Sequence, residues 1–343
     1  MCKRIMAAQT NTDRGVPFFK IGTIGGKADA YISKELFDEY KAKYPFPHKG
    51  EVMITCAGTV GKCIIYNGKD SYYQDSNIVW IDNPNEIISN DFLYHLLCKV
   101  NWSHLNSTTI VRIYNDDLRN LKLYIPQHDE QKKITHLLSL INERIATQNK
   151  IIEDLKKLKS AISLNVLHSD TWEQFKIKDI AQIGRGRVIS SIEISQQKSP
   201  TYPVYSSQTS NDGIMGYLDD YMFEGEYISW TTDGANAGTV FYRNGKFNCT
   251  NVCGLLKLIK GFDTHFVSLV LAEATKEYVS INLANPKLMN NTMGNIQIRL
   301  PKLEEQKRIS IVFRVLQRLW TIHNSLLTEY IKQKQYLLSQ MFI

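Results

Sequence analysis

The sequence predicts a duplicated α+β protein, in which two mixed α/β modules are separated by two long antiparallel coiled-coil helices as a pseudo-two-fold repeat. The stretch YIPQHDEQKKI, which begins at Tyr124, returns as RLPKLEEQKRI from Arg299. Pro126 and Pro301 of these stretches lie 175 residues apart in a chain of 343. A long apolar stripe without Pro or Gly follows each copy, and a block rich in aromatic, Gly, Asn and Thr residues precedes it. A period of half the chain indicates internal duplication.

The repeat divides the chain into four segments. We expect a first module over residues 1–127, a spacer helix over 128–168, a second module over 169–302 and a second spacer helix over 303–343. At roughly 100–200 residues per domain, this length suffices for two modules that each bury a core.

Each module is expected to combine strands with short helices. GEVMITCAGTVGKCIIYNGK, from Gly50, corresponds to GEYISWTTDGANAGTVFYRNGK, from Gly225. Both predict a strand, a loop rich in Thr and Gly, a second strand and an Asn-Gly hairpin turn. Shorter helices are expected at Lys34–Ala42, Asn90–Val100 and Asp263–Tyr278.

The first module differs from the second at its start. When Pro17 is aligned with Pro203, residues Trp172–Arg185 of the second module have no counterpart in the first. The first module is therefore expected to lack the opening strand WEQFKIKDIAQI, which would leave a sheet edge unpaired. A downstream start, a truncated gene or a reshuffled cassette could each explain this difference.

The spacer helices carry a coiled-coil pattern. Apolar side chains recur at alternating steps of four and three in the first helix, and the second matches it position by position 175 residues later. That spacing is typical of a coiled-coil seam. The first seam is Ile134, Leu138, Ile141, Ile145, Ile152, Leu155 and Ile162, and the second is Ile309, Phe313, Leu316, Trp320, Leu327, Tyr330 and Leu337.

Connection lengths favour antiparallel helices. Each helix of roughly 35 residues would be about 50 Å long, and parallel helices would force the second module to span that distance. Short connections are the rule, so the antiparallel arrangement is favoured. Because the midpoints of antiparallel helices meet, we predict that Gln148 and His323 approach each other across the seam. A polar pair there would fix the register of the two helices.

Composition narrows the possible functions. A net charge of +7 fits a polyanionic partner without requiring one. No apolar run approaches the roughly 20 residues of a membrane span. The N-terminus also lacks the apolar core of a signal peptide, so we expect a soluble, cytoplasmic protein without a membrane partner. The six cysteines show no zinc-like spacing, which predicts reduced thiols and no metal site.

The sequence contains no catalytic motif that we identify. There is no P-loop pattern, and GRGR at Gly184–Arg187 does not open a dinucleotide-binding fold. GANAG at Gly234–Gly238 is a weak candidate for a phosphate cradle, because no lysine and hydroxyl follow it. Adjacent carboxylates such as Asp116–Asp117 more often form turns or caps than acid–base pairs. We therefore predict no catalytic residue, no metal and no cofactor in this chain.

Polar loops that mix cations with small hydrogen-bonding side chains recur in both modules. Arg and Lys can hold phosphates, while Gln, Asn, Ser and Thr can address base edges. For any single residue an ordinary surface role is more frequent, but the repetition in both modules favours nucleic-acid binding. The candidate DNA-binding residues are Lys3, Arg4, Thr10, Asn11, Lys20, Gly58, Thr59 and Lys62 in the first module, and Arg185, Arg187, Ser207, Gln208, Thr231 and Thr232 in the second.

The chain resembles the specificity subunits of type I restriction-modification enzymes over essentially its whole length. The P-x-x-x-E-Q-x-x-I helix openings at Pro126–Ile134 and Pro301–Ile309 carry the resemblance, together with three other stretches. These are WEQFKIKDIAQIGRGR in the second module, and GKADAYISKELFDEYKAKYPFPHKGEVMITCAGTVGK and QDSNIVWID in the first. The resemblance implies two target recognition domains, each reading one half of a split DNA site, with the helices as spacer and docking surface.

The resemblance also implies partners. Modification subunits would carry S-adenosylmethionine chemistry on adenine, and restriction subunits that use ATP and Mg for translocation and cleavage would join them. The chain itself would bind double-stranded DNA without catalysing a reaction. Two alternatives stay open, namely the recognition subunit of another bipartite restriction system whose partner both cleaves and methylates, and a structural coiled-coil adaptor. Missing motifs disfavour a self-contained DNA enzyme.

Overall fold

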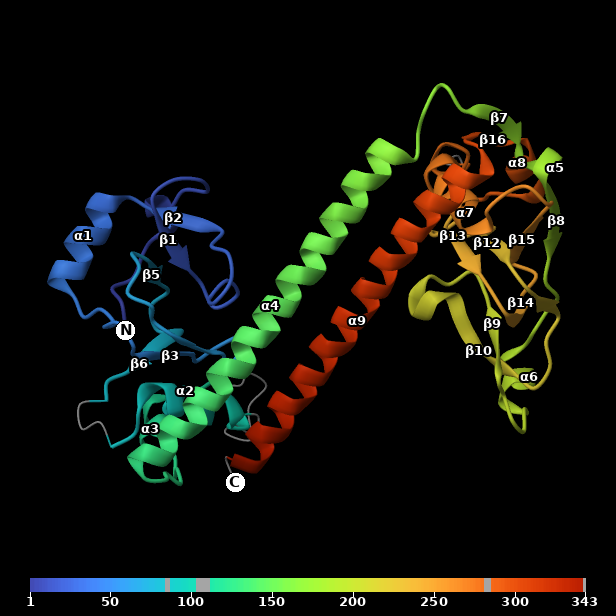
Figure 1. Cartoon of the computed structure of the whole chain (residues 1–343). Helices are drawn as coiled ribbons and strands as arrows, with labels where there is room; N and C mark the ends of the chain where they lie inside the picture. The colour runs from blue at the N-terminus through green and yellow to red at the C-terminus, as the bar shows by residue number, and fades with distance from the viewer. Residues whose placement is uncertain (84–86, 103–111, 281–284, 342–343) are drawn as a thin grey trace. The chain divides into compact units, whose positions relative to one another are not determined.

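The computed structural model describes residues 1–83, 87–102, 112–280 and 285–341. The chain forms two compact units, one of Met1–Asn149 with Ser325–Ile343 and the other of Lys150–Asn324. Each unit holds one mixed module of helices and strands and one end of each long helix (Figure 1). Each module is therefore built onto a pair of helix ends.

The module of the first unit contains two separate sheets. Its elements are η1 (Ala7–Gln9), β1 (Val16–Phe19), β2 (Ala30–Ile32), α1 (Lys34–Lys43), β3 (Val52–Thr55), β4 (Cys63–Ile65), β5 (Tyr72–Tyr73), β6 (Ile78–Ile81), α2 (Asn90–Lys99) and α3 (Asn115–Arg119). Over the described residues, the sheets have the strand orders β2-β1-β5 and β4-β3-β6. Phe37 and Tyr72 belong to the apolar core of the first sheet, whereas Ile54 and Phe92 belong to that of the second.

The module of the second unit is larger. Its elements are β7 (Glu173–Lys176), α5 (Ile177–Ile180), β8 (Ala181–Arg185), α6 (Ser191–Ser195), β9 (Tyr202–Tyr205), η3 (Ser210–Gly213), β10 (Ile214–Leu218), β11 (Phe223–Glu224), β12 (Tyr227–Thr231), β13 (Val240–Arg243), β14 (Lys246–Cys249), β15 (Cys253–Leu258), α7 (Thr264–Ala274), η4 (Thr275–Glu277), α8 (Asn290–Asn295) and β16 (Gln297–Leu300). The strand orders are β10-β9-β14-β11, β13-β12-β15-β8 and β16-β7. The described part of the sheet β4-β3-β6 thus repeats β13-β12-β15 and ends one strand earlier.

The short helices form where the sequence predicts them, as α1, α2 and the pair α7 and η4. Each begins at a side chain that caps the first turn. Ser33 and Ser89 accept hydrogen bonds through their hydroxyl oxygens from backbone N–H groups of α1 and α2, at 3.2 and 3.3 Å. Asp263 accepts the N–H of Phe266 in α7 at 2.7 Å. Such caps satisfy donors that a helix start otherwise leaves free.

The predicted Asn-Gly hairpins are wrong, although the strand–loop–strand units before them are correct. β3 pairs antiparallel with β4, and β12 pairs antiparallel with β13. Asn67–Gly68 then leads from β4 to β5, and Asn244–Gly245 leads from β13 to β14, which in both cases belongs to another sheet. Gly68 and Gly245 adopt φ of +82° and +99°, the left-handed conformation that an Asn-Gly turn requires. The turns therefore form, but they connect strands of different sheets.

The long helices are α4 (His128–Val166) and α9 (Leu303–Met341). In the first unit, the start of α4 packs on the end of α9 in a cluster that includes Ile134, Leu138, Leu337, Leu338 and Met341. In the second unit, the end of α4 packs on the start of α9 in a cluster that includes Ile162, Val166, Ile309 and Phe313. The helices are therefore antiparallel within each unit, as predicted. Gln148 and His323 belong to different units, and their approach stays a prediction.

The glutamine of the first helix-opening motif fastens α4 to its module. Gln131 is completely buried. Its side-chain oxygen accepts the N–H of Ser89 at 2.8 Å, and its Nε2 donates to the carbonyls of Ile87 and Pro126 at 3.1 and 2.9 Å. Since Ser89 caps α2, this one side chain ties the start of α4 to the start of α2.

The second motif makes the same connection. The buried Gln306 accepts the N–H of Asp263, the cap of α7, at 2.9 Å, and its Nε2 donates to the carbonyl of Pro301 at 2.8 Å. The repeated Pro and Gln of the motif thus form a joint between helix and module. A buried side-chain amide needs such partners, which accounts for the glutamine of the motif.

Candidate nucleic-acid interface

A buried threonine braces the loop between β3 and β4. The hydroxyl of Thr55, at the end of β3, donates to the carbonyl of Thr59 and accepts the N–H of Lys62 at 3.0 Å. Gly58 and Gly61 adopt φ of +67° and +82° within the loop, a conformation that side chains with a Cβ rarely take. The backbone of Thr59 and Lys62 is therefore held in one shape, because it is bonded to the strand end.

The second module repeats this brace between β12 and β13. The hydroxyl of Thr231 donates to the carbonyl of Asn236 and accepts the N–H of Thr239 at 3.1 Å. Gly234 and Gly238 adopt φ of +87° and +83°. We call the two segments, residues 55–62 and 231–239, the braced loops.

A guanidinium group lies beside each braced loop but comes from a different element in each module. In the second unit, Arg185 at the end of β8 donates to Asn290 Oδ1 at 2.9 Å and to the carbonyl of Asn251 at 3.3 Å. In the first unit, Arg112 donates to the carbonyl of Ser76 at 3.2 Å. Asn251 and Ser76 occupy matching turns, just before β15 and just before β6.

Backbone bonds connect these turns to the braced loops. The N–H of Thr232 bonds to the carbonyl of Val252 at 3.3 Å, and the N–H of Cys56 bonds to the carbonyl of Asn77 at 2.7 Å. Arg185 is among the DNA-binding candidates predicted from the sequence, whereas Arg112 is not. The signal was present, because the 175-residue offset places Arg112 opposite another cation, Lys287.

Arg187, another candidate DNA-binding residue, already has a charged partner within the second module. Its guanidinium forms a two-point ion pair with Glu193, one contact of which measures 2.9 Å. This hydrogen bonding raises the pKa of Arg187 and lowers the pKa of Glu193. The backbone N–H of Arg187 also donates to the carbonyl of Cys249 at 3.1 Å. Because the charge already has a carboxylate partner, Arg187 is a weaker candidate for DNA contact than Arg185.

Thr231 and Thr232 are two of the candidate DNA-binding residues, and their contact with DNA stays a prediction. Both side chains are buried. Thr231 closes the braced loop, and the Thr232 hydroxyl donates to the carbonyl of Val252 at 2.9 Å. Both hydroxyls form hydrogen bonds to backbone groups and so fix the shape of the loop. Contacts to a ligand would therefore come from other atoms of the loop.

The remaining second-module candidates lie on the loop after β9. Ser207 and Gln208 are half-buried, and Gln208 Nε2 donates to the carbonyl of Ile214. A residue that sequence reasoning missed holds this loop. Arg243 is buried, bonds to Asp212 at 3.1 Å, and stacks 3.6 Å from the ring centroid of Tyr205. A lone Arg in a strand pattern gave no signal of this role.

In the first module, three candidates come together around the braced loop. A Cβ on Gly58 would lie 2.5 Å from Ile21 Cδ1, so the segment after β1 packs directly on this loop. Lys20 precedes Ile21, and its Nζ lies 3.3 Å from Asp29. Lys62 ends the braced loop, and its Nζ is near Gly25 of the same segment after β1. Lys20, Thr59 and Lys62 thus share one surface region.

The N-terminal candidates are held by other contacts. Lys3 Nζ lies 5.1 Å from the ring centroid of Tyr44, at the end of α1, and Arg4 is exposed. Thr10 donates to the carbonyl of Ala7 at 2.8 Å, and Asn11 accepts the N–H of Arg14 at 2.9 Å. These side chains order the segment before β1 and leave the Lys3 and Arg4 charges at the surface.

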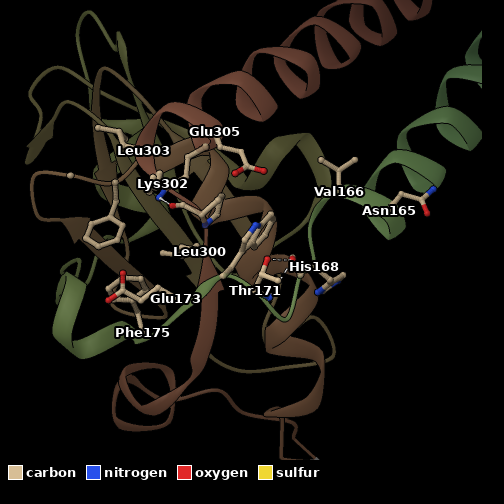
Figure 2. A pocket seen from close by; sticks show the side chains of 16 residues that line it. Asn165, Val166, His168, Thr171, Glu173, Phe175, Leu300, Lys302, Leu303 and Glu305 are labelled. Carbon is tan, nitrogen blue, oxygen red and sulfur yellow. Dashed lines mark hydrogen bonds between the residues drawn. The ribbon is translucent and has the colours of Figure 1, made fainter.

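A cleft of about 830 Å³ lies where the second module meets the helices (Figure 2). Asn165 and Val166 line it from the end of α4 and Glu173 from β7. Lys302, just before α9, and Glu305, in its first turn, line it from the other helix. None of the predicted DNA-binding residues lines this cleft. The cleft therefore lies beside the joint between α9 and the second module, and it is separate from the braced loop of that module.

The described ranges contain neither a metal-ligand cluster nor a candidate membrane-spanning helix. Among these residues no group of three or more His, Cys, Asp or Glu side chains could hold a metal ion. No described helix has the length and apolar character needed to cross a membrane.

Comparison with known proteins identifies the family. A family model described as type I restriction modification DNA specificity domain matches residues 1–157 and again residues 169–333. A putative type I restriction enzyme specificity subunit of Haemophilus influenzae is 49% identical over 138 residues, which are 40% of this chain and 36% of the relative. A putative type I specificity subunit of Mycoplasma pneumoniae is 33% identical over 228 residues, which are 63% of this chain and 83% of the relative.

The fold has a solved counterpart. The crystal structure of the type I restriction-modification system S subunit from M. genitalium matches with a TM-score of 0.72 at 17% identity. The match covers 100% of this chain and 92% of that one. At this identity the likeness establishes the shared fold of two mixed modules and long helices.

Proposed function

Because the chain belongs to the type I restriction-modification DNA specificity family, and carries two of its domains, we propose that each module reads one half of a bipartite, asymmetric DNA site. The helices set the spacing between the half-sites. The chain itself catalyses nothing and supplies recognition to partner subunits.

One observation carries this proposal, the recurrence of a braced loop beside an anchored arginine in both modules. A loop whose backbone is fixed before binding loses little freedom when it meets a ligand. An adjacent guanidinium can bind phosphate or the guanine edge with two hydrogen bonds. The two loops differ in sequence, AGTVGK after Thr55 and Cys56 against TDGANAGT after Thr231, so the half-sites differ and the whole site is asymmetric.

The outer face of α9 supports docking of partner helices. Four of its exposed apolar side chains follow helical spacing, and each of the four is 39–60% exposed. They are Ile311, Val315, Leu319 and Ile322. A second apolar stripe on a helix whose first stripe already faces α4 suits a further coiled-coil contact. Modification subunits with S-adenosylmethionine chemistry on adenine dock here, and restriction subunits that use ATP and Mg join them.

Methylation mapping of the host genome tests the proposal. One bipartite adenine-methylated motif is expected in cells that carry the gene and its partner genes, and deletion of this gene alone removes it. A plasmid copy restores the motif, whereas a copy with Val315→Glu does not, because a carboxylate enters the apolar stripe. Gln335→Glu is the matched control, since it adds the same charge at an exposed position of α9 outside the stripe. An unchanged methylome after deletion would contradict the proposal.

A further inference from the structure

The segment around Lys287 lies against the braced loop of the second module. The N–H of Gly234 donates to the carbonyl of Pro286 at 3.0 Å, and the N–H of Leu288 donates to the carbonyl of Thr232 at 2.8 Å. Lys287 stands between these two bonds, in an isolated antiparallel bridge with the loop. Its backbone is therefore attached to the braced loop from both sides.

The backbone of Lys287 itself is also bonded. Its N–H donates to the hydroxyl oxygen of Ser280 at 3.3 Å, and its carbonyl accepts the N–H of Ser280 at 3.1 Å. The next residue, Leu288, is completely buried, and its carbonyl accepts Nε1 of the buried Trp230 at 2.9 Å. Because the main chain is fixed in this way, only the lysine side chain has freedom to lose when it meets a ligand.

The charge of Lys287 lies at the surface. The residue is exposed, and among the described residues its ammonium group forms no ion pair. Asp233 stands opposite it in the bridge, yet the two side chains do not pair. An ammonium group has three N–H donors. Those of Lys287 are thus directed to solvent from a rigid backbone beside the braced loop.

The same short segment, residues 286–290, also holds the guanidinium of Arg185. Nε of Arg185 donates to Asn290 Oδ1 at 2.9 Å, and its Nη2 lies 3.7 Å from Met289 Sδ. One segment therefore contacts the braced loop, presents Lys287 and positions Arg185. The loop and the two cations belong to one surface of the second module.

The first module places Arg112 at the backbone position of Lys287. The N–H of the following residue, Ile113, donates to the carbonyl of Cys56 at 2.9 Å. Cys56 is the second residue of its braced loop, and the residue after Lys287 bonds to the second residue of the other loop in the same way. A cation precedes this bond in both modules.

The two modules divide the anchoring of the neighbouring turn differently. In the first, Arg112 itself donates to the carbonyl of Ser76 at 3.2 Å. In the second, Arg185 donates to the equivalent carbonyl, that of Asn251, at 3.3 Å. Since Arg185 makes the anchoring bond there, the charge of Lys287 is left for a ligand.

We propose that Lys287 binds a phosphate of the DNA backbone beside the second half-site. The inference rests on the proposed function, because it names a further contact of the same interface. An ammonium group is a compact charge that suits a phosphate oxygen, and its binding releases a condensed cation from the duplex. Phosphate contacts fix the register of a protein on DNA without reading the sequence. Lys287 therefore positions the braced loop and Arg185 on the duplex and does not select bases.

The salt dependence of DNA binding tests the inference in the complex of the full chain with modification subunits. The probes are a duplex with the methylated motif and an unrelated duplex. The logarithm of the affinity falls with the logarithm of the salt concentration by about 0.9 for each phosphate contact. Between about 50 and 200 mM salt, the affinity of the wild-type complex should therefore fall about 3.5-fold further than that of the Lys287→Ala complex, on both duplexes alike.

Two further variants serve as controls. Lys287→Arg keeps the charge and should keep the wild-type salt dependence. Lys260→Ala removes the same charge from an exposed residue beyond the end of β15 that lies away from the braced loop, and it should also leave the salt dependence unchanged. The urea midpoints of all three variants should match that of the wild type, because Lys287 and Lys260 make no side-chain ion pair among the described residues.

A smaller salt dependence for Lys287→Ala alone supports the inference. It is overturned if Lys287→Ala keeps the wild-type salt dependence, or if Lys260→Ala lowers it equally. A loss of affinity confined to the duplex with the motif also overturns it, since that result marks a base contact. A wild-type complex that binds the two duplexes equally would contradict the proposed function, and the inference with it.

Discussion

Arg185 and Arg187 are two positions apart in the sequence but have different partners. Arg185 is held by an amide oxygen and a carbonyl, and among the described residues no carboxylate pairs with its charge, whereas Arg187 is paired with Glu193. Arg185→Ala should weaken DNA binding by about 1–3 kcal/mol in the complex with modification subunits, and Arg187→Ala should weaken it less. Titrations of cognate and unrelated duplexes at several salt concentrations measure both effects.

The pattern of the loss assigns the contact. An equal loss on all sequences marks a phosphate contact, and a loss confined to the cognate site marks a base contact. Arg185→Lys serves as the control that keeps the charge. If neither alanine variant changes binding, the end of β8 does not contact DNA.

Gln306 is expected to matter for stability more than any exposed residue of its motif. Gln306→Ala leaves the N–H of Asp263 and the carbonyl of Pro301 without their partner, and each such loss costs about 1–3 kcal/mol. Urea unfolding of the full chain measures this cost. The neighbouring exposed Glu305 gives the control, because Glu305→Ala should change stability by less than about 0.5 kcal/mol. Equal effects of the two changes would rule out a joint built on the glutamine.

For single residues, the sequence predicts the composition of the polar loops well. It predicts the contacts of each residue in those loops less well. Thr231 was visible as part of a polar loop, yet its role as a brace depends on the carbonyl of Asn236, which the fold brings to it. Arg112 was overlooked because it stands outside the Gly- and Thr-rich loops. Arg243 was overlooked because cations in strands usually face solvent. In each case the deciding partner is distant in sequence or is a backbone atom.

Among the elements, the long helices were the most predictable. Their apolar stripe repeats with one period over about eight helical turns, and the same stripe occurs twice, so chance agreement is excluded. The strands were predictable in pairs but not in sheets. Asn67–Gly68 has the chemistry of a tight turn whether the next strand returns to the same sheet or enters another. Only packing of the following strand, β5, against β1 decides between these outcomes.

Equal insertions in α4 and α9 should alter spacing without altering recognition. Adding about one helical turn to both helices lengthens them by about 5.4 Å, which corresponds to between one and two base pairs of duplex. Methylation mapping should then show the original half-sites separated by a longer gap. A change in the identity of the methylated bases would contradict the proposed division between reading and spacing.

For the molecule as a whole, recognition should be modular. Exchange of residues 169–302 for the corresponding module of another family member should change one half of the methylated motif and leave the other half and the gap intact. The physical reason is that each module has its own core, its own braced loop and its own arginine. Methylation mapping of the hybrid reads out both halves at once. Alteration of both half-sites would show that the modules do not read independently.

The glutamine joint has a consequence for how such genes can change. Gln131 and Gln306 bond exclusively to main-chain atoms in the contacts described above, so the joint does not depend on which side chains the attached module carries. Recombination that begins in a helix-opening motif can therefore deliver an unrelated reading surface to an unchanged attachment point. Duplicate helix sequences also give homologous recombination two places to cross over within one gene. A lineage could acquire a new DNA recognition sequence in a single crossover, without intermediates that fail to fold at the joint between helix and module.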